Sequence, residues 1–194
     1  LNLSISPIFP AQYAQSRRIA CDAWNQIKDT EYTMNALSWG WWIDRIYQYN
    51  DADHVVLRDA TEGENRARIT SSIITGLFIT GDDYSDNGSE EVKNRARKYL
   101  TNPDVNAIAT GRSFRPLEGN NDKSENMFIR KDKDGTIYLA VFNYTENARS
   151  FTLPLARIGI NSAQTTTELW SHRNISRNES ISIPTKDALI FKIK

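Results

Sequence analysis

The feature that most constrains the fold is a change in patterning near residue 115 of the 194-residue chain. Before it, short apolar runs alternate with segments of helical periodicity. After it, short apolar runs follow one another without helices between them. Alternating strands and helices are typical of βα units around a parallel sheet, whereas successive short strands indicate an antiparallel sandwich. The sequence therefore predicts an α/β part over residues 1–112 and an all-β domain over residues 113–194.

Capping signals mark two of the expected helices. Thr61-Glu62-Gly63-Glu64 has the pattern of a capping box and precedes apolar residues at near-helical spacing up to Leu77. Ser89 is expected to cap a later helix that ends at Asn102-Pro103, because proline disfavours helical backbone in the residue before it. A further helix is expected over residues 29–37, and strands over residues 18–23, 43–49 and 77–80.

The second part of the chain carries a hairpin signal. Asp132-Lys133-Asp134-Gly135 lies between two alternating runs, and Asp-Gly in that position favours a tight turn. A polar stretch over residues 118–125 is expected to be a linker or a long loop. Further strands are expected over residues 150–153, 165–170, 179–183 and 188–193.

Composition argues against several classes of function. The chain has 24 basic and 24 acidic residues, so its formal net charge is zero and no global field attracts nucleic acid or an anionic membrane. No window approaches the roughly 18 apolar residues of a membrane span. Cys21 is the single cysteine, and there are two histidines. We therefore expect no disulfide framework, metal site or cofactor, and no nucleic-acid or membrane partner, and we expect Cys21 to be an inert buried thiol.

A polar segment, Tyr49-Asn50-Asp51-Ala52-Asp53-His54, ends an apolar-aromatic run that begins at Trp41. Asp and Asn are poor strand formers, so their position at the end of a buried strand needs a reason. Barrel strands that deliver side chains to the C-terminal rim show such an end. An ordinary turn is the alternative, because Asn-Asp is common turn chemistry.

The order of these features resembles the α-galactosidase (melibiase) clan of retaining glycoside hydrolases, which have a (β/α)8 barrel followed by a C-terminal antiparallel β domain. Residues 49–54 resemble the Trp-Asn-Asp-Pro-Asp-Met motif of the seventh barrel strand. Residues 77–83 resemble the eighth strand, residues 100–108 the eighth helix, and Glu168-Leu169-Trp170 the Asp-Leu-Trp of the β domain. The resemblance implies the C-terminal part of a (β/α)8 barrel followed by an antiparallel β-sandwich.

The resemblance also implies site residues. Arg18-Ile19-Ala20-Cys21-Asp22 matches a family pattern in which an Arg contacts substrate and an Asp four residues later is the general acid/base. Asp22 is thus the expected acid/base, with Asp29 as the alternative. Positions four apart in an extended strand face the same side, so Arg18 and Asp22 are expected to point into one pocket. Asp51, Asp53 and Trp24 are the other expected substrate contacts.

A retaining mechanism needs a second carboxyl group, about 5–5.5 Å from the acid/base, as nucleophile. The family's nucleophile is an Asp at the fourth strand, which would lie upstream of Leu1. The resemblance therefore implies a downstream portion of a longer α-glycosidase that is inactive alone and cleaves terminal α-linked sugars from an oligosaccharide or glycoside. Its expected partners are the missing N-terminal half or a second copy of itself, and an extracellular or periplasmic location is favoured.

One interpretation from another functional class stands beside the enzyme. The chain is alternatively a non-catalytic carbohydrate-binding or structural β-sandwich module, in which Asp22 would be an ordinary surface charge. The tryptophans Trp24, Trp39, Trp41 and Trp42 would form a sugar platform in that case, or the walls of an enzyme pocket. The segment 82–88 has oxygen ligands on alternate residues, but it lacks the bidentate Glu of a calcium loop, so no calcium site is expected.

Overall fold

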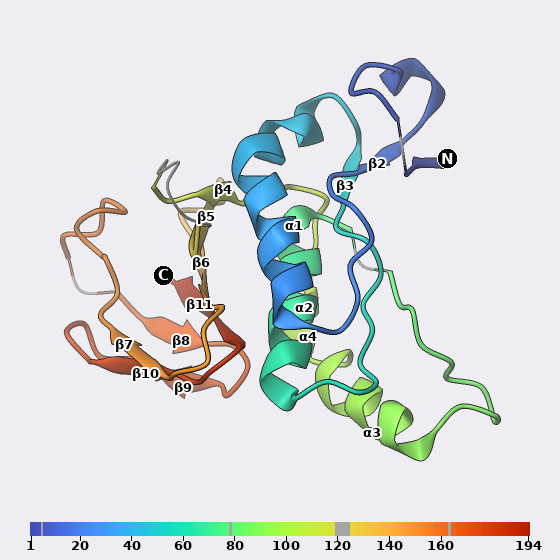
Figure 1. The fold of residues 1–194 in the computed structure, drawn as a ribbon. Coiled ribbons are helices and arrows are strands. Elements are labelled where there is room, and N and C mark those ends of the chain that lie inside the picture. Colours follow the sequence, from blue (N-terminus) through green and yellow to red (C-terminus); the bar gives the residue numbers. More distant parts are fainter. Residues whose placement is uncertain (5, 78, 119–124, 163) are drawn as a thin grey trace.

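A computed structural model describes residues 1–4, 6–77, 79–118, 125–162 and 164–194. Figure 1 shows two parts: short strands with long helices in blue to green, and sheets in yellow to red that pack against those helices. Parallel pairing comes first along the chain and antiparallel pairing second, in the expected order. The proposed boundary at residues 112 and 113 stays a prediction.

The first part contains a parallel sheet with the order β1-β2-β3, and each strand has only two or three residues. Isolated parallel bridges join Asp51 to Leu77 and Val55 to Thr80, so two residues of the strand expected over 77–80 pair with the segment that starts at β3 without forming a named strand. Within the described residues these strands do not close into a barrel. The strands are β1 (Asn2–Leu3), β2 (Ser16–Arg18) and β3 (Tyr49–Asp51).

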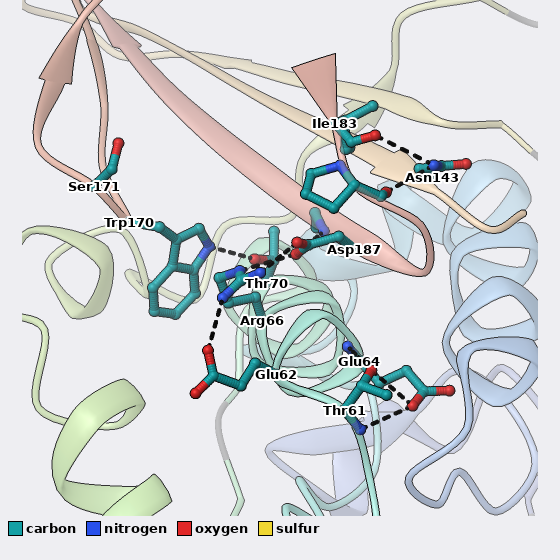
Figure 2. A network of polar contacts seen from close by, with 12 residues as sticks. Thr61, Glu62, Glu64, Arg66, Thr70, Asn143, Trp170, Ser171, Ile183 and Asp187 are labelled. Atoms are coloured by element: carbon teal, nitrogen blue, oxygen red, sulfur yellow. Dashed lines mark hydrogen bonds and ion pairs between the residues drawn. The ribbon is translucent and has the colours of Figure 1, made fainter. Parts of the chain in front are cut away.

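Within the described ranges, four α-helices and two 3-10 helices accompany this sheet. The capping box is confirmed, because Thr61 Oγ1 accepts from the Glu64 amide at 3.2 Å and the Glu64 carboxylate accepts from the Thr61 amide at 3.0 Å (Figure 2). Ser89 Oγ accepts from the Val92 amide at 3.2 Å, as expected of a cap. The helices are η1 (Ala11–Tyr13), α1 (Ile27–Gly40), η2 (Trp41–Arg45), α2 (Glu62–Thr75), α3 (Glu90–Tyr99) and α4 (Pro103–Asn106).

Two of the expected strands are wrong in part. Residues 43–49 are mostly not extended, because η2 continues the chain from α1 and the strand begins only at Tyr49. Ile43 and Tyr47 are buried in a small core with Ala14, so their apolar character serves packing of a helical turn rather than a strand. The strand expected over residues 18–23 is instead β2 at Ser16–Arg18, and the chain bends at Ala20 and Cys21, so of the expected residues only Arg18 belongs to a strand.

The second part is a sandwich of a six-stranded sheet, β4-β5-β6-β11-β8-β9, and a two-stranded sheet, β10-β7, with antiparallel pairing throughout. The hairpin signal is confirmed, because β5 and β6 flank residues 132–135 and Gly135 has a φ of +86°. Most of the expected linker, residues 119–124, lies outside the described residues. The strands are β4 (Arg115–Pro116), β5 (Met127–Lys131), β6 (Ile137–Asn143), β7 (Arg149–Phe151), β8 (Thr166–Glu168), β9 (Arg173–Asn174), β10 (Ile181–Ile183) and β11 (Asp187–Ile193).

The six-stranded sheet is apolar on both faces and therefore contributes to two cores. Ala140 and Phe142 of β6 belong to the core that includes Ile69 and Ile73 of α2. The neighbouring Leu139 and Val141 face the other way, into a core shared with β7 and β10. This places the sandwich against α2, which in turn lies against the parallel strands. No helix among the described residues is long and apolar enough to cross a membrane.

Candidate active site

The candidate site lies where β2 and β3 end, at the carboxyl edge of the parallel sheet. The two strands pair in register from Ser16 opposite Tyr49 to Arg18 opposite Asp51. Parallel strands place their carboxyl ends at one edge, and ligands of parallel α/β folds bind at that edge. The polar segment that follows β3 therefore lies beside the bend that follows β2.

Arg18 is the centre of a polar cluster that also contains Asp22, Asp51 and Asp53. Its Nη2 lies 2.8 Å from Asp22 Oδ1, and its Nη1 lies 3.1 Å from Asp53 Oδ1. The Arg18 side chain is 12% exposed, whereas Asp22 is 66% exposed and Asp53 10%. Burial acts to lower the pKa of Arg18, but the charges and hydrogen bonds of Asp53 and Asp22 outweigh it and raise the pKa above its ordinary value. A permanently charged guanidinium thus links an exposed carboxylate to a buried one.

The structure brings Arg18 and Asp22 together for a different reason than expected. Residues four apart in an extended strand have Cα atoms roughly 13 Å apart, and their side chains stand away from the strand axis, so a straight strand does not favour the observed 2.8 Å ion pair. Instead, β2 ends at Arg18 and the chain bends at Ala20 and Cys21, which folds Asp22 back onto the guanidinium. The spacing was informative, but the extended geometry was wrong.

Asp53 is held from several sides. Its Oδ2 accepts from the Ala23 amide at 2.8 Å, and His54 Nδ1 lies 3.1 Å from its Oδ1. The Asp53 backbone has a φ of +70°, a left-handed conformation that Asp adopts more readily than most residues. Burial acts to raise the pKa of Asp53, but the hydrogen bonds from the Ala23 and His54 amides and the nearby charges outweigh it and lower the pKa. Asp53 is therefore an ionised carboxylate that organises the site.

Asp51 is directed into the protein rather than toward a substrate. It is buried, its Oδ1 accepts from the Asp53 amide at 2.8 Å, and its Oδ2 accepts from Asn2 Nδ2 at 2.6 Å. Asn2 belongs to β1, so this carboxylate connects the first and third strands of the parallel sheet. Both carboxylate oxygens of Asp51 thus accept hydrogen bonds from within the protein.

Asp22 borders an open cavity of about 560 Å³. Neither Asp51 nor Asp53 lines this cavity, and no tryptophan does. The expectation that Arg18, Asp22, Asp51 and Asp53 share a single pocket with tryptophan walls is therefore wrong for this cavity. Cys21 is exposed at this cavity, with Sγ 3.8 Å from the Tyr32 hydroxyl, which corrects the expectation of a buried thiol. The lining residues are Ser4, Ser6, Arg17, Arg18, Ile19, Ala20, Cys21, Asp22 and Tyr32.

The tryptophans divide between the two ends of the sheet. Trp24 is half-exposed near the cluster, and its ring meets the His54 ring edge-on with centroids 5.0 Å apart. Trp41 lines a separate cavity of about 1050 Å³ together with Tyr49, at the start of β3. Trp42 donates its indole N–H to the Trp39 carbonyl at 2.8 Å, at the junction of α1 and η2. Of the four, Trp24 alone is placed near the cluster.

The alternative acid, Asp29, serves the start of α1. Its carboxylate accepts from the Gln26 amide at 3.4 Å and from the Trp24 amide at 3.3 Å, and it forms the capping box of the helix. It lines a smaller cavity of about 300 Å³ with Trp24 and Arg58, next to the cluster but not shared with Asp22. The local role of Asp29 is explained by helix capping.

Sequence reasoning did not identify Arg68, which lies beneath this cluster. It is 1% exposed, on the face of α2 that packs toward residues 52–54. The available signal was a charged residue immediately before the apolar Ile69, followed by the small Ser71 and Ser72 that leave room for a long side chain. No group of three or more metal-ligating side chains was found in the described part of the chain.

Comparison with known proteins identifies the second part of the chain. Residues 123–193 match the family model of the α-galactosidase C-terminal β-sandwich domain. Among curated proteins none matches the chain. The match confirms the resemblance predicted from the motifs.

Solved structures are similar over nearly the whole chain. A GH27 β-L-arabinopyranosidase from Geobacillus stearothermophilus, in complex with arabinose, has a TM-score of 0.81 at 18% identity, covering 99% of this chain and 50% of that one. α-Galactosidase I from Mortierella vinacea has a TM-score of 0.72 at 13% identity, covering 95% and 54%. An α-galactosidase from Saccharomyces cerevisiae has a TM-score of 0.66 at 11% identity, covering 93% and 59%. The chain thus has their fold and spans about half their length.

Proposed function

We propose that this chain, whose residues 123–193 belong to the α-galactosidase C-terminal domain family, is the downstream part of a retaining α-glycosidase with a (β/α)8 barrel. The observation that carries the proposal is the Arg18–Asp22 ion pair at the carboxyl edge of parallel strands, beside an open cavity. The similarity of 99% of the chain to half of a glycosidase structure supports it. A terminal α-galactoside or β-L-arabinopyranoside is the proposed substrate, on the analogy of those structures.

Asp22 is the proposed general acid/base, because it is the most accessible of the three clustered carboxylates. Asp53 and Asp51 are engaged by backbone amides and by the side chains of Arg18 and Asn2. In the retaining mechanism the acid/base first protonates the leaving oxygen and then takes a proton from water. Arg18 would hold Asp22 in place and contact a sugar hydroxyl.

The nucleophile would come from a segment preceding residue 1. β1 lies at the edge of the parallel sheet, and its outer side is unpaired within the described ranges, so a preceding βα unit has a strand edge to join. We therefore propose the N-terminal half of the same enzyme as the first partner of this chain and self-association as the second. A nucleophile from that half would stand about 5–5.5 Å from the Asp22 carboxyl group.

A carbohydrate-binding module without catalysis is the competing proposal, and the position of Asp22 separates the two. In a binding module Asp22 would be an ordinary surface charge, whereas here it is paired with a mostly buried arginine and borders a cavity. This placement supports the enzyme.

The test compares Asp22→Asn with the unmodified protein, each supplied with the N-terminal half. We expect a loss of about 10²–10⁴-fold on glycosides with poor leaving groups. The first step on aryl α-glycosides with good leaving groups should be spared, because they need little protonation. Asp29→Asn is the matched control. Its ratio of activity on poor leaving groups to activity on good leaving groups should equal that of the unmodified enzyme. Equal loss on both substrate types in Asp22→Asn, or the selective loss in Asp29→Asn instead, would contradict the assignment.

A further inference from the structure

Arg68 is a fully buried arginine that has no carboxylate ion-pair partner in the part of the chain that the structure describes. Its side chain is 1% exposed, and its hydrogen bonds go to carbonyl and hydroxyl oxygens. Arginine is almost never fully buried unless it is paired, since burial of an uncompensated charge is costly. The burial of Arg68 therefore needs an explanation, and its hydrogen bonds provide one.

The contacts of Arg68 converge on the segment that carries Asp53. Nη2 donates to the Ala52 carbonyl, and Nε donates to the His54 carbonyl at 3.2 Å. The two carbonyls flank Asp53, so one planar guanidinium holds both ends of a three-residue segment. Nη1 lies 3.3 Å from Thr33 Oγ1 of α1 and 3.3 Å from Ser71 Oγ of α2, which fixes the orientation of the guanidinium.

We infer that Arg68 is a positioning residue that locks residues 52–54 so that the Asp53 carboxylate stays directed at Arg18 and at the Ala23 amide. Asp53 has a left-handed backbone, and carbonyls held on both sides restrain it in that conformation. From there Asp53 Oδ1 reaches Arg18, whose other nitrogen holds Asp22. The proposed series of contacts therefore runs from Arg68 through the 52–54 backbone to Asp53, and from Asp53 through Arg18 to Asp22.

The charge of Arg68 also favours a fixed, ionised Asp53. Burial lowers the pKa of Arg68 to about 10, and the charges of Asp53, Asp29 and Asp51 act against that lowering. Arg68 is therefore protonated at neutral pH. A cation beneath the cluster favours the ionised carboxylates around it.

A matched control exists on the next helix. Arg95 of α3 also holds a loop by its carbonyls, donating to Leu57 at 2.9 Å and to Ala60, and it contacts Asn65 Oδ1 at 3.1 Å. It has an exposed partner, Glu91. Arg95→Gln removes a comparable set of bonds from a neighbouring loop that does not carry Asp53.

The experiment is backbone amide hydrogen exchange on the full chain, comparing Arg68→Gln, Arg68→Lys and Arg95→Gln. In Arg68→Gln we expect exchange of the Ala23 and Asp53 amides at least tenfold faster than in the unmodified chain. The Ala23 amide donates to the Asp53 carboxylate, and the Asp53 amide itself belongs to the 52–54 segment and donates to Asp51, so both bonds depend on the position of that segment. Arg68→Lys keeps the charge but cannot span both carbonyls, so it should also show acceleration. Arg95→Gln should leave both amides unchanged.

Unchanged Ala23 and Asp53 amides in Arg68→Lys would overturn the inference, and so would equal acceleration in Arg95→Gln. If Arg68→Gln fails to fold, Arg68→Lys carries the test alone. The inference concerns the same site as the proposed function, but its readout does not require activity. Accelerated exchange in a protein that shows no glycosidase activity with its N-terminal half would reject the function and retain the positioning role.

Discussion

The parallel part and the sandwich of this molecule are stabilised in opposite ways. In the sandwich, β6 and β11 have seven residues each and pair along their whole length, with apolar side chains on both faces. In the parallel part no named strand exceeds three residues, and β3 ends in the buried polar residues Asn50 and Asp51. Backbone ladders therefore define the sandwich, whereas side-chain hydrogen bonds to backbone define the edge of the parallel sheet.

This difference shows which part of the molecule holds side chains in one fixed arrangement. A buried polar cluster stabilises one arrangement only if every member is satisfied, and it gives preorganised charges when it is. Asp51, Asp53 and Arg68 are held in this way, and they surround the accessible Asp22. The sandwich contributes no residue to the cavity beside Asp22, because the residues that line this cavity all precede residue 33. The proposed chemistry belongs to the parallel part, and the sandwich supports α2 behind it.

The two parts meet along α2, as Figure 2 shows. Arg66 donates to both carboxylate oxygens of Asp187, which begins β11, and the Trp170 indole N–H donates to Thr70 Oγ1 at 3.2 Å. Gly63 allows close approach, because a Cβ there would lie 2.7 Å from the Lys186 carbonyl oxygen. Three adjacent turns of one helix thus contact the sandwich.

Breaking this junction should have the largest effect on stability. Asp187→Ala leaves the mostly buried Arg66 with only the exposed Glu62, 3.9 Å away, and removal of one member of a buried pair typically costs about 3–5 kcal/mol. The free energy of unfolding from urea titration measures the loss. Glu118→Ala removes the exposed partner of Arg157 and should cost less than about 1 kcal/mol. Equal losses in the two variants would mean that the junction does not couple the parts.

A smaller effect is expected from the capping box of α2. Thr61→Ala removes the acceptor of the Glu64 amide and should lower the free energy of unfolding by about 1 kcal/mol. Thr61→Ser keeps the hydroxyl and serves as the control. If α2 depended on the sandwich alone, Thr61→Ala and Thr61→Ser would have the same urea midpoint.

The same contrast explains how far the sequence predicts the structure. The hairpin at Gly135 and the caps at Thr61 and Ser89 are local, so the residue types involved predict them directly. The 3-10 helix over residues 41–45 was missed because its apolar residues pack in a small tertiary core, which an apolar run does not distinguish from a strand. Local signals were sufficient for most of the sandwich.

The candidate site was predictable only in its residue types. The four-residue spacing of Arg18 and Asp22 indicated proximity, but the bend that brings them together is followed by a long-range hydrogen bond from the Ala23 amide to Asp53, which the spacing does not indicate. The burial of Arg68 depends on carbonyls of a segment 14 to 16 residues earlier in the chain. These are long-range side-chain-to-backbone contacts, which leave no periodic signal in the sequence.

The smallest expected effect is a pH dependence that tests whether Asp53 contributes stability to the parallel part. Its pKa in the folded protein is lowered from 3.8, so the folded state favours the ionised carboxylate. The resulting stabilisation is present above the unfolded value of 3.8 and is lost as pH falls through the lower folded pKa. Urea midpoints of the unmodified chain should therefore fall more steeply below about pH 4 than those of Asp53→Asn, which cannot titrate there. Parallel curves for the two proteins would show that the Asp53 carboxylate directs the site without stabilising the fold.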